Sequence, residues 1–240
     1  VNTMVKTTTF DDATQKFTVR TQHVGSGEEN VAEFDYVICC TGHFSVPNVP
    51  EFEGMEAFGG RIMHAHDYRS AEEFTDQRIL VIGTSYSAED IASQCYKYGV
   101  KSVHLSWRSA PMGFHWPDNF TTVPLLEKIT PGSKTCHFKD GSTAEIDAII
   151  LCTGYKHHFP FVDPSLRLST GNRLVCDDLH EGVVWPHNPR MMYIGMQDQW
   201  LTFNMFDAQA WYARDVIMGR IALPDRVAMQ EEWQQWRAEE

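Results

Sequence analysis

The fold is decided by the stretch Val81-Ile82-Gly83-Thr84-Ser85-Tyr86-Ser87-Ala88-Glu89-Asp90. The apolar residues 77–82 form a predicted strand, and residues 84–98 have helical spacing that ends at Gly99. Residues 101–107 return to a strand pattern. This order predicts a β-α-β unit and therefore a parallel sheet. The apolar stripe of the predicted helix consists of Ile91, Ala92, Cys95 and Tyr98.

The turn between the strand and the helix has the order required of a dinucleotide site. We expect Gly83 to make the turn and the small Ala88 to let helix and sheet pack closely. Ser85 replaces the middle glycine of the usual pattern, and its hydroxyl could donate to a phosphate. Backbone N–H groups at a helix start favour a pyrophosphate. The candidate phosphate-binding residues are Gly83, Thr84, Ser85, Tyr86 and Ser87.

The residues at the end of the second strand distinguish an NADP-binding site from an NAD-binding site. Sites for NAD carry an acidic residue there, whereas sites for NADP carry an arginine. This chain has Arg108 and no carboxylate, and either Ser106 or Ser109 could add a donor. Arg108 could pair bidentately with a 2′-phosphate, although a solvated arginine is the common alternative. The pattern favours NADPH.

A second pattern occurs twice along the chain. Residues 35–43 and 147–155 both read as an acidic residue, an apolar strand, Cys-Thr-Gly and an aromatic ring. A small Thr-Gly turn lets backbone approach a ligand at the carboxyl edge of a sheet. The alternative is that two sheet strands simply end in tight turns.

The remaining segments give a coarse secondary structure. The apolar stripe of the first of two C-terminal helices is predicted to be Phe206, Ala210, Ala213 and Ile217. We expect a hairpin over 1–24, a strand over 32–40 buried on both faces, a loop over 118–132, a hairpin over 134–146, a strand over 190–195, and helices over 203–220 and 226–240.

Composition excludes several classes of protein. The net charge of −12 argues against a nucleic-acid surface. No run approaches the roughly 18 apolar residues that a membrane span needs, and the N-terminus does not resemble a signal peptide. The six cysteines lack CxxC spacing, and His64 and His66 have no neighbouring carboxylate cluster, so no metal site is expected. Buried thiols in a reducing compartment predict a cytoplasmic protein.

One motif carries a resemblance to a family. Residues Phe58 to Tyr68 match the pattern Phe-x-Gly-x-x-x-His-x-x-x-(Phe/Tyr), which resembles the identifying sequence of the flavin-containing monooxygenases. The Baeyer–Villiger enzymes usually differ at the end of this motif, where the chain has Tyr68-Arg69. Segments 116–120 and 197–206 are similar to those of the bacterial trimethylamine monooxygenases.

The resemblance implies an α/β fold in which an NADPH-binding Rossmann-like domain is inserted in an incomplete FAD-binding Rossmann-like domain with β-hairpin elements. The implied boundaries are 1–50 and 159–240 for the FAD-binding parts and 51–158 for the NADPH-binding domain. The implied activity is oxygenation of tertiary amines such as trimethylamine, or of sulfides, by O2 through a flavin C4a-hydroperoxide. The alternatives are a Baeyer–Villiger or N-hydroxylating enzyme and a non-catalytic NADPH-binding fragment.

The resemblance also implies roles for individual residues. Tyr86 would lean toward the active-site cavity, and Trp200 would cover the flavin or substrate unless it belongs to the core. His64 would contact NADP or order the linker, with a structural hinge as the alternative. The implied FAD contacts are Val5, Gln197, Gln199 and Thr202.

The N-terminal FAD loop and an active-site asparagine of the family are absent from these residues. We therefore expect the chain to need that missing segment and to show neither flavin retention nor turnover alone. The complete enzyme is expected to be a homodimer.

Overall fold

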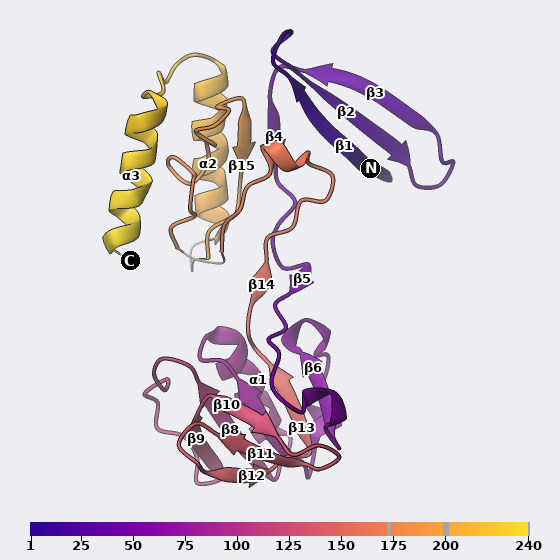
Figure 1. The fold of residues 1–240 in the computed structure, drawn as a ribbon, viewed down its shortest axis with the longest axis vertical. Helices are drawn as coiled ribbons and strands as arrows, with labels where there is room; N and C mark the ends of the chain where they lie inside the picture. The colour runs from indigo at the N-terminus through magenta and orange to yellow at the C-terminus, as the bar shows by residue number, and fades with distance from the viewer. Residues whose placement is uncertain (172–173, 199–201, 240) are drawn as a thin grey trace. The chain divides into compact units, whose positions relative to one another are not determined.

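The computed structural model describes residues 1–171, 174–198 and 202–239. The chain forms two compact units, shown in Figure 1. The outer unit comprises Val1–Val46 and Tyr155–Glu240, and the inserted unit comprises Pro47–Gly154. The predicted α/β class is confirmed, with a parallel sheet in the inserted unit.

The inserted unit is built on a five-stranded sheet with the order β6-β13-β7-β8-β9. Every neighbouring pair in this sheet is parallel. The predicted β-α-β unit is confirmed as β7, α1 and β8, and Gly99 follows the helix with φ of 81°. The elements are β6 (Arg61–His64), β7 (Arg78–Ile82), α1 (Tyr86–Lys97), β8 (Ser102–Trp107), β9 (Phe120–Pro124) and β13 (Ala148–Leu151).

Two layers cover this sheet, which explains why its central strands β7 and β13 are almost entirely apolar. The helix α1 packs on one face, where Ala148 and Ile150 of β13 lie. A three-stranded antiparallel sheet packs on the other face, against Ile149 and Leu151. It consists of β10 (Leu126–Ile129), β11 (Thr135–Phe138) and β12 (Thr143–Glu145), of which the last two are the predicted hairpin.

The predicted loop over 118–132 is wrong, because it contains β9 and β10. The strand β9 lies at the edge of the parallel sheet, where Pro124 ends the strand without removing a central hydrogen bond. Only Val123 of β9 is fully buried, so its sequence lacks the apolar run of a central strand. The predicted place of Tyr98 on the buried stripe of α1 is also wrong, since this residue is 51% exposed.

The outer unit combines an antiparallel meander with a short parallel pair. The meander confirms the predicted N-terminal hairpin and adds a third strand. The helices α2 and α3 follow the parallel pair, and α2 packs on β15 through Ala213 and Val216. The elements are β1 (Thr3–Asp11), β2 (Lys16–His23), β3 (Glu29–Phe34), β4 (Val37–Cys39), β15 (Met191–Tyr193), α2 (Thr202–Ile217) and α3 (Arg226–Glu239).

Two predictions for the outer unit need correction. Residues 32–40 form two strands, since β3 pairs with β2 and β4 pairs in parallel with β15. The strand β4 is not buried on both faces, because Ile38 is 39% exposed. The predicted stripe of α2 is rotated: Gln209, Ala213 and Val216 are buried, whereas Ala210 is exposed.

The shorter elements connect these parts. No helix in the described ranges is long and apolar enough to cross a membrane. The connecting elements are β5 (Val46–Pro47), β14 (Tyr155–Lys156) and 3-10 turns at Met55–Ala57, Ala65–Asp67, Ala71–Phe74 and Pro164–Leu166.

Candidate functional site

The carboxyl edge of the inserted unit's sheet brings together the predicted nucleotide-binding residues. In the register of the parallel strands, Leu151 lies beside both His64 and Ile82, and Ile82 lies beside Ser106. The turn after β7, the end of β8 and the Thr-Gly turn after β13 therefore meet at one edge. Ligands of open α/β sheets bind outside this edge.

Gly83 lies where two strand ends approach most closely. Its N–H donates to the Ser106 carbonyl at 3.0 Å, and the Cys152 N–H donates to the Ile82 carbonyl at 2.8 Å. A Cβ atom on Gly83 would lie 2.2 Å from the Cys152 carbonyl oxygen. The backbone φ of 137° is also one that other residues rarely adopt. Glycine is therefore needed for close packing of β7 against β13 as well as for the turn.

The start of α1 is open to solvent. Ser85 is the N-cap residue, and its carbonyl accepts from the N–H groups of Ala88 and Glu89. Residues 84–87 are exposed, with Tyr86 at 41%, while Ala88 is fully buried against the sheet. The first N–H groups of an α-helix have no partner within the helix, and the helix dipole adds positive potential there. This geometry can hold an anionic group such as a pyrophosphate.

Arg108 follows the end of β8 and is exposed, next to the exposed Ser109. This residue is thus placed at the same edge as the start of α1, because β7 and β8 are parallel neighbours. The suggestion that Ser106 donates to a ligand is wrong. Ser106 is buried, and its hydroxyl donates to the Pro124 carbonyl at 3.0 Å.

His64 ends β6 at this edge and is only 4% exposed. Its Nδ1 accepts from the His66 N–H at 3.0 Å. Burial lowers the pKa of the His64 imidazole, against the opposing effect of a hydrogen bond with the Gly154 backbone. A neutral ring thus connects the end of β6 to the Thr-Gly turn after β13.

The predicted flavin-contacting residues belong to the outer unit. Val5 lies on β1 beside a register shift and is 36% exposed. Thr202 begins α2, and Gln197 precedes it on the segment that follows β15. Within the described residues, no recorded hydrogen bond joins Val5 to either of them. Gln199 and Trp200 lie outside the described residues.

Two buried polar residues near this segment were not predicted from the sequence. Gln209 of α2 is 3% exposed, and its Oε1 accepts from the Gly195 N–H at 2.9 Å. His43, which follows the first Thr-Gly pair, is 6% exposed, and its Nδ1 donates to the Gly195 carbonyl at 2.9 Å. The sequence signal for Gln209 is its helical spacing from Ala213 and Val216, which puts a polar residue on the core face.

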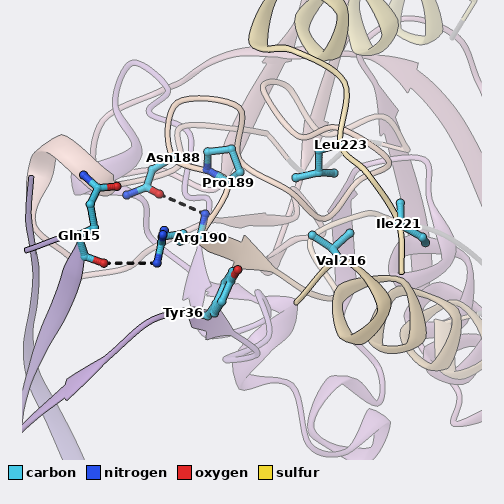
Figure 2. Close-up of a pocket in the computed structure, with 8 residues that line it drawn as sticks. All are labelled: Gln15, Tyr36, Asn188, Pro189, Arg190, Val216, Ile221 and Leu223. Carbon is cyan, nitrogen blue, oxygen red and sulfur yellow. Dashed lines mark hydrogen bonds between the residues drawn. The ribbon is translucent and has the colours of Figure 1, made fainter. Parts of the chain in front are cut away.

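Figure 2 shows a separate pocket of about 360 Å³ in the outer unit. One wall is polar, where Arg190 donates to the Gln15 carbonyl at 3.5 Å and its guanidinium lies 5.7 Å from the Tyr36 ring centre. The opposite wall is apolar. No predicted site residue lines this pocket. Its lining residues are Gln15, Tyr36, Asn188, Pro189, Arg190, Val216, Ile221 and Leu223.

The comparisons with known proteins agree with this architecture. The family model for flavin-binding monooxygenase-like proteins matches residues 1–113 and 124–240. The chain therefore belongs to this family of flavin-binding proteins, which confirms the family predicted from residues 58–68.

Particular relatives are named trimethylamine monooxygenase. The one from Roseovarius sp. strain 217 is 60% identical over 220 residues, covering 92% of this chain and 49% of the relative. The one from Methylocella silvestris is 56% identical over 236 residues, covering 98% of this chain and 52% of the relative. The solved structure of Tmm from Pelagibacter sp. strain HTCC7211 has a TM-score of 0.89 at 49% identity, covering 98% of this chain and 53% of that one. The chain thus spans about half the length of the relatives it matches.

Proposed function

We propose that this chain is the nicotinamide-binding part, with adjoining flavin-domain segments, of an FAD- and NADPH-dependent monooxygenase. Its substrates would be tertiary amines such as trimethylamine, or sulfides, and O2 would be the oxidant. The main support for this proposal is the 56–60% identity to trimethylamine monooxygenases along more than nine-tenths of the chain. The exposed helix start and arginine at one sheet edge supply the chemistry that such an enzyme needs for NADPH.

NADPH is assigned to the carboxyl edge of the inserted unit. Residues 83–87 would hold the pyrophosphate at the start of α1, and Arg108 would pair with the 2′-phosphate. His64, with its ring already bonded to neighbouring backbone, would order this edge. Tyr86 is exposed beside the phosphate position and is assigned to the side facing the substrate.

Binding of NADPH and NADH by calorimetry tests this assignment. Arg108→Ala is expected to weaken NADPH about 10- to 100-fold and to leave NADH unchanged, because it removes charge-assisted hydrogen bonds to the 2′-phosphate only. The control is Lys101→Ala, which removes an exposed positive charge near the amino end of the same strand. Equal weakening of both nucleotides by Arg108→Ala would refute the 2′-phosphate assignment.

FAD is assigned to the outer unit. When bound, it would supply the oxygen-transfer chemistry, while the chain binds, orients and excludes water. The proposed contacts are the backbone of Val5, the segment 197–202 with Gln197, Gln199 and Thr202, and Trp200 over the ring or substrate. The open space beside Gly42, whose added Cβ would meet no atom within 4 Å, leaves room for a ligand near the end of β4.

The outer unit supports binding of further polypeptide next to β4. The Val37 N–H donates to Arg190, and the Cys39 carbonyl accepts from Ile194, so the backbone groups of Ile38 point to the opposite edge. No strand in the described residues pairs at that edge. Parallel sheets are normally covered on both faces, yet Ile38 is 39% exposed. The helix α2 also exposes Phe203 and Trp211, and Met218 directly after the helix is exposed as well.

We therefore propose that FAD retention and turnover need the segment of the relatives that this chain does not match. The chain alone is expected to purify without the visible absorbance of bound flavin. Expressed together with that segment from the Methylocella silvestris relative, it is expected to retain flavin and to oxidise NADPH in the presence of trimethylamine. Stoichiometric flavin in the chain alone would refute the dependence. The complete enzyme is proposed to be cytoplasmic and to form a homodimer. Sedimentation equilibrium tests the homodimer.

A second candidate is a nucleotide-binding module without catalysis. It is favoured by the self-contained core of the inserted unit, which carries every residue assigned to NADPH. NADPH binding without turnover after complementation supports this candidate. Formation of trimethylamine N-oxide excludes it.

A further inference from the structure

We infer that His43 is a positioning residue, which acts with His157 and Gln209 to hold the backbone of Gly195–Gln197. This turn leads into α2 and carries the proposed flavin contact Gln197, so the inference rests on the proposed function. The three side chains come from distant parts of the outer unit: the end of β4, the segment after β14, and the middle of α2.

The Gly195 peptide unit is held from both sides. Its N–H donates to Gln209 Oε1 at 2.9 Å, and its carbonyl accepts from His43 Nδ1 at 2.9 Å. Both side chains are more than nine-tenths buried, so water does not compete with either bond. Gly195 has φ of 78°, and a Cβ there would meet the Phe206 ring at 3.0 Å. The glycine is thus fixed in a backbone conformation that other residues rarely adopt.

The next two residues are held by the same group of side chains. His157 Nε2 donates to the Met196 carbonyl at 3.0 Å, and its ring centre lies 5.0 Å from that of His43. Gln209 Nε2 donates to Gln197 Oε1 and also reaches the Gly182 carbonyl at 3.4 Å. Three consecutive residues are therefore held by side chains from three separate segments of the outer unit.

The two histidines use opposite ring nitrogens. A carbonyl oxygen only accepts, so His43 carries its proton on Nδ1 and His157 carries one on Nε2. Burial lowers the pKa of His157, and the nearby His43 lowers it further, against the opposing effect of hydrogen bonds with the Met196 and Thr170 backbones. His43 Nε2 is buried without a hydrogen-bond partner in the described part of the chain, so within that part the ring makes one hydrogen bond, to Gly195.

Because the two rings bond through different nitrogens, each histidine has one substitution that keeps its hydrogen bond and one that loses it. An asparagine amide nitrogen takes nearly the place of Nδ1, and a glutamine amide nitrogen takes nearly the place of Nε2. His43→Asn and His157→Gln are therefore expected to keep the bonds to Gly195 and Met196. His43→Gln and His157→Asn are expected to lose them.

Two measurements test the inference. We call the hold of His43, His157 and Gln209 on the backbone of residues 195–197 the clamp. Hydrogen exchange of the amides of these three backbone residues, measured in the chain alone, reports whether the clamp exists. The FAD affinity of the complemented enzyme reports whether the clamp positions the flavin contact. The bond-losing variants are expected to exchange about tenfold faster and to bind FAD about tenfold more weakly. The bond-keeping variants are expected to stay close to the parent chain, which also controls for folding.

Each other outcome overturns a distinct statement. If all four variants exchange alike, the clamp does not exist. If exchange separates the two pairs but FAD affinity does not, the clamp is structural and the positioning role is refuted. If the complemented parent protein binds no FAD while exchange still separates the pairs, the proposed function fails, and the positioning role fails with it.

Discussion

Replacing Gly83 by alanine adds one methyl group at a crowded backbone position of the nucleotide-binding edge. The new Cβ would lie 2.2 Å from the Cys152 carbonyl oxygen and 3.0 Å from its carbon, whereas ordinary contact begins at about 3.4 Å. The end of β13 must therefore move away from β7. That movement breaks the hydrogen bond from the Cys152 N–H to the Ile82 carbonyl, because this bond joins the two strands at the same point.

The cost has two parts. Overpacking in a rigid core costs about 1–3 kcal/mol, and forcing a side chain into a rarely populated backbone region costs about another 1–3 kcal/mol. Together the two parts should lower the free energy of unfolding by about 2–6 kcal/mol. For a domain of about 100 residues this lowers the melting temperature by roughly 10–30 °C.

Thermal unfolding followed by circular dichroism measures this loss. The control is Gly141→Ala in the β11–β12 turn, which has φ of 83° but no atom within 4 Å of the added Cβ. It should cost about 1 kcal/mol, from backbone strain alone. Below both melting temperatures, Gly83→Ala should also weaken NADPH, since the start of α1 shifts with the turn. If the two variants melt together, close strand approach is not what requires glycine at position 83.

Two further substitutions probe the cores. Asp147→Asn should cost about 1.5–3 kcal/mol at pH 7 in urea unfolding, because Arg78 donates three hydrogen bonds to that carboxylate, two from its guanidinium and one from its backbone N–H, and Lys134 donates a fourth. These partners keep the pKa of Asp147 well below its usual range, so the contribution is present above about pH 4 and is lost as the pH falls toward the folded pKa. Tyr193→Phe should cost about 1–3 kcal/mol, because the buried hydroxyl donates to the Leu166 carbonyl at 2.8 Å.

Exposed groups of the same type provide the controls. Asp35 pairs with Lys16 but is 59% exposed, so Asp35→Asn should leave the free energy of unfolding almost unchanged. Tyr96 is 45% exposed, and Tyr96→Phe should be close to neutral. A cost for Asp147→Asn that is the same at pH 7 and pH 3 would contradict the ion-pair account. Equal effects at the two tyrosines would contradict a role for the buried hydroxyl.

Much of the inserted unit was predictable because its signals are local. The apolar runs of β7 and β13, the helical spacing of α1 and the turn at Gly83 each lie within a dozen residues. The strands β9 and β10 were not predictable, since each is defined by pairing with a neighbour and only partly by burial. Ser106 shows the same limit, because its hydroxyl is occupied by Pro124 of an adjacent strand.

The family, the α/β class and the β-α-β unit with its candidate phosphate-binding turn can be predicted from the amino-acid sequence, because these depend on local order and spacing. The need for glycine at position 83 appears only in the folded chain, where the end of a strand almost 70 residues later passes against it. Only the tertiary structure brought His43, His157 and Gln209 onto one turn. Hydrogen bonds between distant segments depend on which backbone atoms the strand register places in reach, and no local pattern records that register.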